Sequence, residues 1–202
     1  MKKGQQTKER MIAAAAELLR KRGYYGTGVS EIIRESGAPK GSLYFHFPGG
    51  KEELACVALA HAGDEWGQRL GAVVRAAPSL ADAALAVCRT LADDLVNTEY
   101  VNGCPLATVA LEAAHNSEPV RKVCEERYQA WEELIRDDLH ERGKNPDDAA
   151  ELATLVLSAV EGAALLTRVY RDRTPLERVG KQLQRLLAAP GAGGSGAGEP
   201  ES

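Results

Sequence analysis

A helix-turn-helix pattern near the N-terminus is the feature that most constrains this chain. Val29, Ile32 and Ile33 have the i, i+3, i+4 spacing of one buried helix face. Gly37 is suited to end that helix in a left-handed conformation, and Pro39 suits the first position of a following helix, where no N–H is needed. The sequence therefore predicts two short helices joined by a tight turn.

The second helix of this pattern leaves several side chains available to a ligand. Leu43 and Phe47 lie one turn apart and can face the core, whereas the remaining positions carry the candidate DNA contacts Lys40, Gly41, Ser42, Tyr44 and His46. A glycine lets the backbone approach a phosphate closely, and the positive N-terminus of a helix favours that anion. An ordinary helical hairpin with exposed polar residues has the same pattern.

An amphipathic helix ahead of the pair completes a unit of the size of a small DNA-binding domain. Its apolar stripe is formed by Ile12, Ala15, Ala16 and Leu19, and Gly23 ends it. Three helices are therefore expected within about the first fifty residues, consistent with a helix-turn-helix domain at 1–50.

Three runs carry a resemblance to a known family: GYYGTGV at 23–29, GAPKGSLYFHF at 37–47 and KEEL at 51–54. They resemble the N-terminal domain of TetR-family transcriptional repressors. The Thr-Gly pair, the Ala-Pro-Lys-Gly-Ser run and the extra glycine before Lys51 resemble the LmrA/YxaF-like branch. Gly28 stands where many members place a capping Ser or Thr, so Thr27 is expected to supply the cap, and Thr27 and Lys51 are expected to hold phosphates.

The charge is distributed unevenly along the chain. Residues 1–53 contain ten Lys or Arg against six Glu, a net charge of +4, and because the whole chain carries −4, the remainder carries −8. A basic head on an acidic body directs phosphate to one end of the molecule.

The four cysteines are widely spaced, and no signal peptide or apolar run of membrane-spanning length is evident, which favours a reducing cytoplasm without membrane association. Most of these thiols are expected to be buried small hydrophobes. Cys104 precedes Pro105 at an expected helix start, where the thiol pKa is lowered, so a redox-responsive regulator using Cys104 is one alternative function.

Helical periodicity continues through residues 51–189, which we interpret as a ligand-binding and dimerisation domain in an all-α fold. A long helix from Lys51 to the Ala77–Pro78 break is expected to connect head and body. Ser79 can cap the next helix, which Asn102–Gly103 is expected to interrupt, and further helices are expected at about 105–114, 118–142, 147–170 and from Pro175. The Gly, Ala and Ser rich residues 190–202 are expected to be a disordered tail.

The last two helices are the expected dimer interface. The helix at 147–170 is apolar most of the way round, which is typical of a helix buried between neighbours, and the final helix carries an apolar seam. The seam can pack inward in a monomer, but the resemblance implies a four-helix homodimer interface through Leu155, Ala159, Leu166, Leu176, Val179, Leu183 and Leu186.

Large aromatic residues are scarce, at 5% of the chain, and suggest a small-molecule pocket in the body. Its expected lining is Trp66, Leu91, Leu95, Leu106, Tyr128 and Trp131. Ordinary core packing explains these residues equally well from sequence, but the resemblance implies a hollow body that binds an aromatic or lipophilic inducer. The acidic excess of the body could also attract a cation, although a solvated surface explains it too.

Enzyme, cofactor and metal functions lack support in the sequence. The Gly50–Lys51 pair does not form a phosphate loop, and the four histidines show no metal-ligand spacing. The favoured reading is a ligand-responsive repressor that binds double-stranded operator DNA as a homodimer. The other alternative is a helical interaction protein that does not bind DNA.

Overall fold

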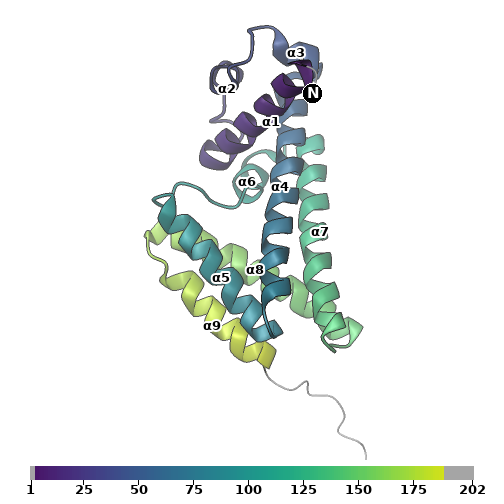
Figure 1. The fold of residues 1–202 in the computed structure, drawn as a ribbon, viewed down its shortest axis with the longest axis vertical. Coiled ribbons are helices and arrows are strands. Elements are labelled where there is room, and N and C mark those ends of the chain that lie inside the picture. The colour runs from purple at the N-terminus through teal and green to yellow at the C-terminus, as the bar shows by residue number, and fades with distance from the viewer. Residues whose placement is uncertain (1–2, 189–202) are drawn as a thin grey trace, which may run out of the picture.

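The computed structural model describes residues 3–188 and shows an elongated, all-helical molecule with no strand in that range (Figure 1). Its helices are α1 (Lys3–Arg22), α2 (Val29–Ser36), α3 (Ser42–His46), α4 (Gly50–Ala76), α5 (Leu80–Asn97), α6 (Ala107–Ala113), α7 (Glu118–Glu141), α8 (Pro146–Tyr170) and α9 (Thr174–Ala188). The all-α fold predicted from the sequence is confirmed. The predicted tail at 190–202 lies outside the described residues.

The head consists of α1, α2 and α3, which close over a small, filled core. Phe47 and Leu43 are fully buried there, as predicted, and so is Met11, which the predicted stripe of the first helix did not include. Gly37 ends α2 in the left-handed conformation, with φ of 60°. Pro39, in contrast, is not the first residue of α3. Its carbonyl accepts hydrogen bonds from the backbone N–H groups of Gly41 and Ser42, so Pro39 belongs to the turn and the helix begins at Ser42.

Helix α4 runs from the head down through the body and packs against α1 at one end and α7 along its length (Figure 1). One hydrophobic cluster extends without a break from the head core into α4, α6 and the first half of α7. The domain division at residues 50 and 51 stays a prediction, because the packing crosses it.

The rest of the body is built from α5, α8 and α9, which share a second hydrophobic cluster. The Ser79 hydroxyl accepts a hydrogen bond from Asp82 N at 3.1 Å, so the predicted cap of α5 is confirmed. The predicted interruption at Asn102–Gly103 is displaced: α5 ends at Asn97, and Glu99 and Tyr100 both adopt positive φ in the turn that follows.

Helix α8 differs from the sequence prediction of a helix buried on all sides. Its small residues face its neighbours, whereas Leu155, Leu165, Val169 and Tyr170 are exposed. By length and composition α8 also contains an 18-residue stretch apolar enough to cross a membrane, with a mean hydropathy of 1.6, so the expectation that no such run exists is wrong. In this structure α8 packs along α7 and α9, and one of its faces lacks a partner within the chain.

Candidate DNA-binding surface and ligand cavity

The surface of the head around α3 presents a mixed polar and aromatic face. Lys40 and Gly41 are exposed, Tyr44 is 67% exposed, and Ser42 and His46 are partly buried. The short helix holds this face in place because Leu43 and Phe47 anchor its opposite side. These five predicted DNA contacts therefore lie together on one outer surface.

Phe45 belongs to the same surface and was missed from the sequence. It is 80% exposed, and its ring packs edge-on against His46 with centroids 4.9 Å apart. An apolar ring so exposed, on a helix of five residues, is a candidate for contact with sugar or a thymine methyl. The sequence signal for Phe45 was its position between Tyr44 and His46, two predicted DNA contacts.

Thr27 does not occupy the role predicted for it. Its side chain is 1% exposed, and its hydroxyl donates to the Gly23 carbonyl at 2.7 Å. The residue at the start of α2 is Gly28, and no side chain caps that helix. The hydroxyl points inward because it closes the turn after α1, so it cannot both hold that turn and reach a phosphate.

Lys51 also turns toward the protein. Its Nζ donates to the Tyr24 carbonyl at 2.7 Å and lies 4.3 Å from the centroid of the Tyr24 ring. Desolvation by burial lowers the pKa of Lys51, and the nearby Glu112 carboxylate offsets part of that shift. In this conformation Lys51 supports the α1–α2 turn, whereas the exposed Lys40 remains available to phosphate.

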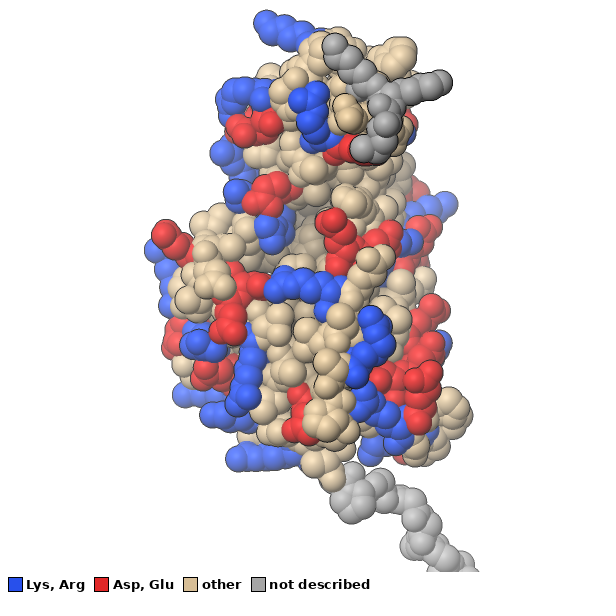
Figure 2. Space-filling model, viewed as in Figure 1, with Lys and Arg blue, Asp and Glu red and all other residues tan. Residues whose placement is uncertain are grey.

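The charge pattern of the head is moderated by local ion pairs. The Glu31 carboxylate forms ion pairs with Arg22 at 2.6 Å and with Arg34 at 3.1 Å. These pairs leave less unpaired positive charge on the head than the count of residues in the sequence indicates. Figure 2 shows Lys and Arg side chains along one edge of the head and both signs of charge over the body. Phosphate attraction is therefore concentrated near particular side chains.

Helix α6 joins the head to the body through Glu112. Its Oε2 accepts a hydrogen bond from Tyr25 N at 3.3 Å, and Asn116 Nδ2 donates to the Tyr25 hydroxyl at 3.1 Å. The Glu112 carboxylate lies directly against Gly23, whose φ is 72°. A side chain at position 23 would be strained and would collide with the carboxylate, so glycine is required there for this contact.

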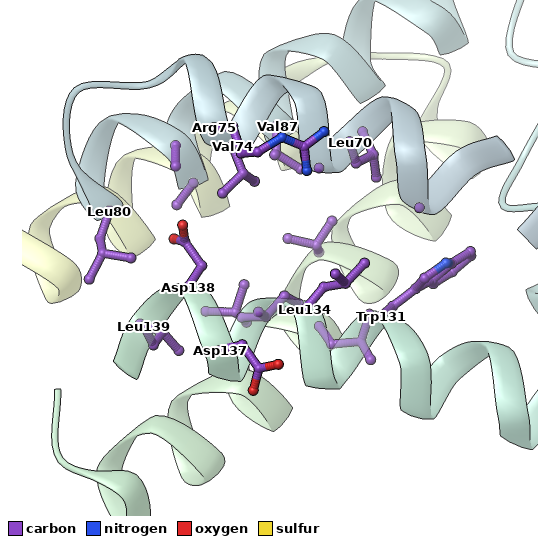
Figure 3. Close-up of a pocket in the computed structure, with 18 of the residues that line it drawn as sticks. Leu70, Val74, Arg75, Leu80, Val87, Trp131, Leu134, Asp137, Asp138 and Leu139 are labelled. Carbon is purple, nitrogen blue, oxygen red and sulfur yellow. The ribbon is translucent and has the colours of Figure 1, made fainter. Parts of the chain in front are cut away.

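A cavity of about 390 Å³, partly open to solvent, lies in the body between α4, α5, α7 and α8. Figure 3 shows Leu70 and Val74 on one side of it and Leu134 and Trp131 on the other. The Trp131 indole is fixed by a hydrogen bond from Nε1 to the Gly63 carbonyl at 3.0 Å. Gly67 has no side chain to obstruct this ring, which therefore lies against the α4 backbone.

The predicted pocket residues divide into three groups. Trp66 and Trp131 line the large cavity, as the pocket prediction required. Leu91 and Leu95 instead line a neighbouring cavity of about 30 Å³, which is large enough for water but not for an organic ligand. Leu106 and Tyr128 line neither: Leu106 is fully buried in the core shared with the head, and Tyr128 packs edge-on against Trp131.

Glu161 is the cavity residue that sequence reasoning missed. It lies on α8 and lines both the large and the small cavity. Burial raises the pKa of its carboxyl group, and a hydrogen bond with the Cys104 thiol offsets part of that shift. The signal in the sequence was a single carboxylate in the otherwise uncharged, apolar run at 153–167.

The cysteines do not support the redox alternative. The sequence suggested a lowered pKa for Cys104, but burial and the nearby Glu161 carboxylate raise it well above the ordinary value. Burial also raises the pKa of Cys88 and that of Cys124 to about 11. Neutral, buried thiols react slowly with oxidants because the thiolate is the reactive form.

The predicted dimer residues are also split between two environments. Leu155, Leu166 and Leu186 are exposed on the unpartnered face of α8 and α9, and Ala159 and Val179 are partly buried. Leu176 and Leu183 are 0% and 4% exposed because the seam of α9 packs inward against α5, so these two cannot contact a second chain.

No group of three or more His, Cys, Asp or Glu side chains is arranged to hold a metal ion within residues 3–188. The absence of such a group assigns no function by itself. The two candidate sites are therefore the outer surface of α3 and the cavity of the body.

Two family models cover most of the chain. The model described as "Bacterial regulatory proteins, tetR family" matches residues 11–56, and "Transcriptional regulator LmrA/YxaF-like, C-terminal domain" matches residues 81–182. The first match contains the outer surface of α3, and the second contains most of the cavity wall.

Individual relatives agree with these matches over nearly their whole length. The HTH-type transcriptional regulator LmrA of Bacillus subtilis is 36% identical over 90% of this chain and 96% of its own. A TetR transcriptional regulator from Chloroflexus aurantiacus has a crystal structure with a TM-score of 0.77, 31% identity, and coverage of 92% of this chain and 96% of its own. A cysteine mutant of CifR, crystallised with operator DNA, shares the fold at a TM-score of 0.76 and 24% identity, over 90% and 96% of the two chains.

Proposed function

The chain belongs to the TetR family of bacterial transcriptional regulators, in its LmrA/YxaF-like branch, and from this premise we propose that it is a dimeric repressor released from its operator by a small molecule. It is a DNA-binding regulator by family. The proposal concerns what controls the binding and which residues carry it. A regulator of bacterial genes acts where the DNA is, so we also propose a cytoplasmic location.

The outer surface of α3 is the proposed DNA contact. We assign groove contacts to Tyr44, Phe45 and Ser42, and a phosphate contact to Lys40, because Lys40, Tyr44 and Phe45 are exposed and Ser42 is partly exposed, all within α3 or the turn before it. Phosphate contacts position the protein and base contacts specify the sequence, so the two kinds of residue have different expected effects.

The observation that carries the proposed ligand response is the cavity of about 390 Å³ with two tryptophans in its wall. Its walls are mostly apolar, as is typical of small-molecule sites. Helix α4 lines the cavity at Trp66 and Leu70 and begins beneath the head at Gly50, so one rigid element belongs to both sites. The Glu112 contact to the α1–α2 turn gives a second connection between body and head.

Release follows if the ligand-bound body favours a head arrangement that does not fit the operator. A switch from 1:99 to 99:1 requires a difference of roughly 5.5 kcal/mol in ligand affinity between the two states, and partial release requires less. The ligand must therefore contact parts of the body that move relative to each other, which a cavity between α4, α5, α7 and α8 provides.

The proposed dimer forms through the exposed apolar face of α8 and α9, defined by Leu155, Leu165, Leu166, Val169, Tyr170 and Leu186. A contiguous apolar face is costly to leave in water, and a two-fold dimer presents two α3 helices to a palindromic site. Leu166→Glu should give folded monomers that no longer bind operator, whereas Leu183→Glu should unfold the body. Sedimentation velocity with circular dichroism separates these results, and a wild-type monomer at micromolar concentration would contradict the dimer.

The function is tested with the purified full chain and the DNA upstream of its own gene. A gel-shift assay should show specific binding, and aromatic and lipophilic compounds should release the DNA while changing tryptophan emission. Failure to bind this DNA would overturn the DNA part of the repressor model. Binding that no compound of these classes reverses would overturn its ligand part.

A further inference from the structure

We propose that the Glu161 carboxylate recognises the ligand of the body cavity and that the cavity selects arylalkyl amines, whose amino group is an ammonium cation at neutral pH, over neutral aromatic molecules of the same shape. The inference rests on the proposed function in taking the cavity as the ligand site, and it adds the chemical class of the ligand. Its starting point is the position of Glu161, whose side chain lines both cavities of the body.

Two basic residues around the small cavity are paired with other carboxylates, and a third, Arg168, lies against Gly103 of its lining and donates to the Thr108 hydroxyl at 3.5 Å. Arg69 pairs with Asp94 at 2.6 Å, and Arg20, which lines the small cavity, pairs with Glu17 at 2.6 Å. The Cys104 thiol, a weak and neutral donor, shares the lining of the small cavity with Glu161. A carboxylate buried without a counter-charge is destabilised, and a cation beside it removes that penalty.

The lining of the small cavity contains a second hydrogen-bond acceptor, the Asn102 side-chain oxygen, to which no group of the described residues donates. Asn102 lines it together with Glu161, and the buried Asn102 Oδ1 has no hydrogen-bond partner in the structure. Two acceptors in the lining of the small cavity, one of them shared with the large cavity, favour a guest with several N–H donors at one end. An ammonium group has three donors and no acceptor.

Charges around the large cavity also favour a cation. The carboxylates in its lining are those of Asp137, Asp138, Glu141 and Glu161. Arg75 is the one basic residue among the lining residues described, and Arg142 pairs with Asp138 at 3.1 Å from outside the lining. In Figure 3 the Asp138 carboxylate points toward the cavity and that of Asp137 points away from it. The excess of negative charge raises the local concentration of cations.

The aromatic walls fit the other end of such a molecule. Trp131 is held by its bond to Gly63, and Tyr128 packs against it edge-on with centroids 5.5 Å apart and rings at 84°. A fixed indole offers its face to an aromatic ring or to the cation itself. An arylalkyl amine therefore satisfies the walls and Glu161 together.

The test uses two probes of nearly the same shape, 1-naphthylmethylamine and 1-naphthylmethanol, with the full-length protein. Both tryptophans of the chain line the cavity, so intrinsic emission reports on this site. Wild-type protein should bind the amine at least about tenfold more tightly than the alcohol, the effect expected for a hydrogen bond to a charged group. Glu161→Gln should remove that preference while leaving affinity for the alcohol within about twofold.

Asp137→Asn is the matched control, because that carboxylate lines the cavity but points away and pairs with Arg136 at 3.1 Å. The Asp137→Asn variant should keep the amine preference. If Glu161→Gln does not fold, Glu161→Asp replaces it in the test: this variant keeps the charge and should retain part of the preference. Equal affinity of wild type for both probes, binding of neither probe, or an unchanged preference in folded Glu161→Gln would overturn the inference. If the amine binds through Glu161 without releasing operator, the inference stands and the ligand part of the proposed function fails.

Discussion

The head and the body of this molecule differ in how completely their apolar side chains fill the interior. In the head, short helices close completely over Phe47, Leu43 and Met11, none of which is more than 1% exposed. In the body, longer helices leave about 390 Å³ unfilled in a cavity whose lining includes Trp66 and Trp131. The head is filled where the body is hollow.

This difference follows from what each part is proposed to do. Contacts with base edges require fixed geometry, and close packing supplies it because side chains in a filled core have one arrangement. A ligand response requires space, and unfilled space costs stability because the lining side chains lose packing partners.

Phe47→Ala should lower the free energy of unfolding by about 3–5 kcal/mol, because a fully buried ring leaves a cavity that the head cannot refill. Leu134→Ala, on the half-exposed wall of the body cavity, should cost about 1 kcal/mol. Urea unfolding followed by far-UV circular dichroism measures both. Equal losses would mean that the head is no better packed than the body.

Enlarging an alanine should separate the two regions in a second way. Ala15→Leu in the head core should cost about 1–3 kcal/mol, since the site has no room for three more carbons. Ala84→Leu, on the cavity wall, should leave the unfolding free energy nearly unchanged and weaken ligand binding. A large destabilisation by Ala84→Leu would show that the cavity cannot accept a side chain.

Tyr44→Ala should cost about 1–3 kcal/mol of specific operator binding, because the exposed ring is positioned to meet the groove. Its unfolding free energy should equal that of the wild type. Competition between operator and unrelated DNA measures the specific part, and unchanged specificity in the folded variant would remove Tyr44 from the DNA-binding surface.

Lys40→Ala should weaken binding to all DNA and reduce the salt dependence by about one charge. Lys51→Ala is the matched comparison: its ammonium is bound to the Tyr24 carbonyl, so it should weaken operator binding while keeping the salt slope of the wild type. Affinity measured over a salt series distinguishes them. A lower slope for Lys51→Ala would restore the phosphate contact expected from the sequence.

Glu112→Gln should have the smallest effect, reducing the coupling between ligand and operator by about 0.5–2 kcal/mol. The change weakens the hydrogen bond that joins α6 to the α1–α2 turn and leaves both sites intact. Operator affinity with and without ligand gives the coupling directly. Glu118→Gln, which removes an exposed carboxylate paired with Arg121, should leave it unchanged.

Much of the fold was predictable from local signals. Gly23 and Gly37 end their helices at the expected residues, and Ser79 caps the helix it precedes. Such features are determined by a few adjacent residues, so the sequence carries them completely. Pro39 failed as a helix start because its carbonyl bonds to two N–H groups of a turn, a detail that helix propensity alone does not determine.

The candidate sites were harder to predict, since they depend on which neighbour a side chain faces. Periodicity showed that Leu183 lies on a buried seam but not whether α5 or a second chain buries it. Composition made Leu106 suitable for a pocket wall, while packing placed it in the core shared with the head. The Thr27 hydroxyl points inward for the same kind of reason, because the Gly23 carbonyl is its nearest acceptor.

The length of α4 gives the molecule a mechanical advantage. Its 27 residues make a rod of about 40 Å, since a helix rises 1.5 Å per residue. A tilt of about 5° at the cavity end moves the far end by roughly 3–4 Å over that length. In a symmetric pair the two displacements add, and the spacing they alter must match one turn of DNA, about 34–36 Å. In the proposed dimer, a guest that fits the cavity therefore produces a mismatch at the DNA larger than the displacement it causes in its own cavity.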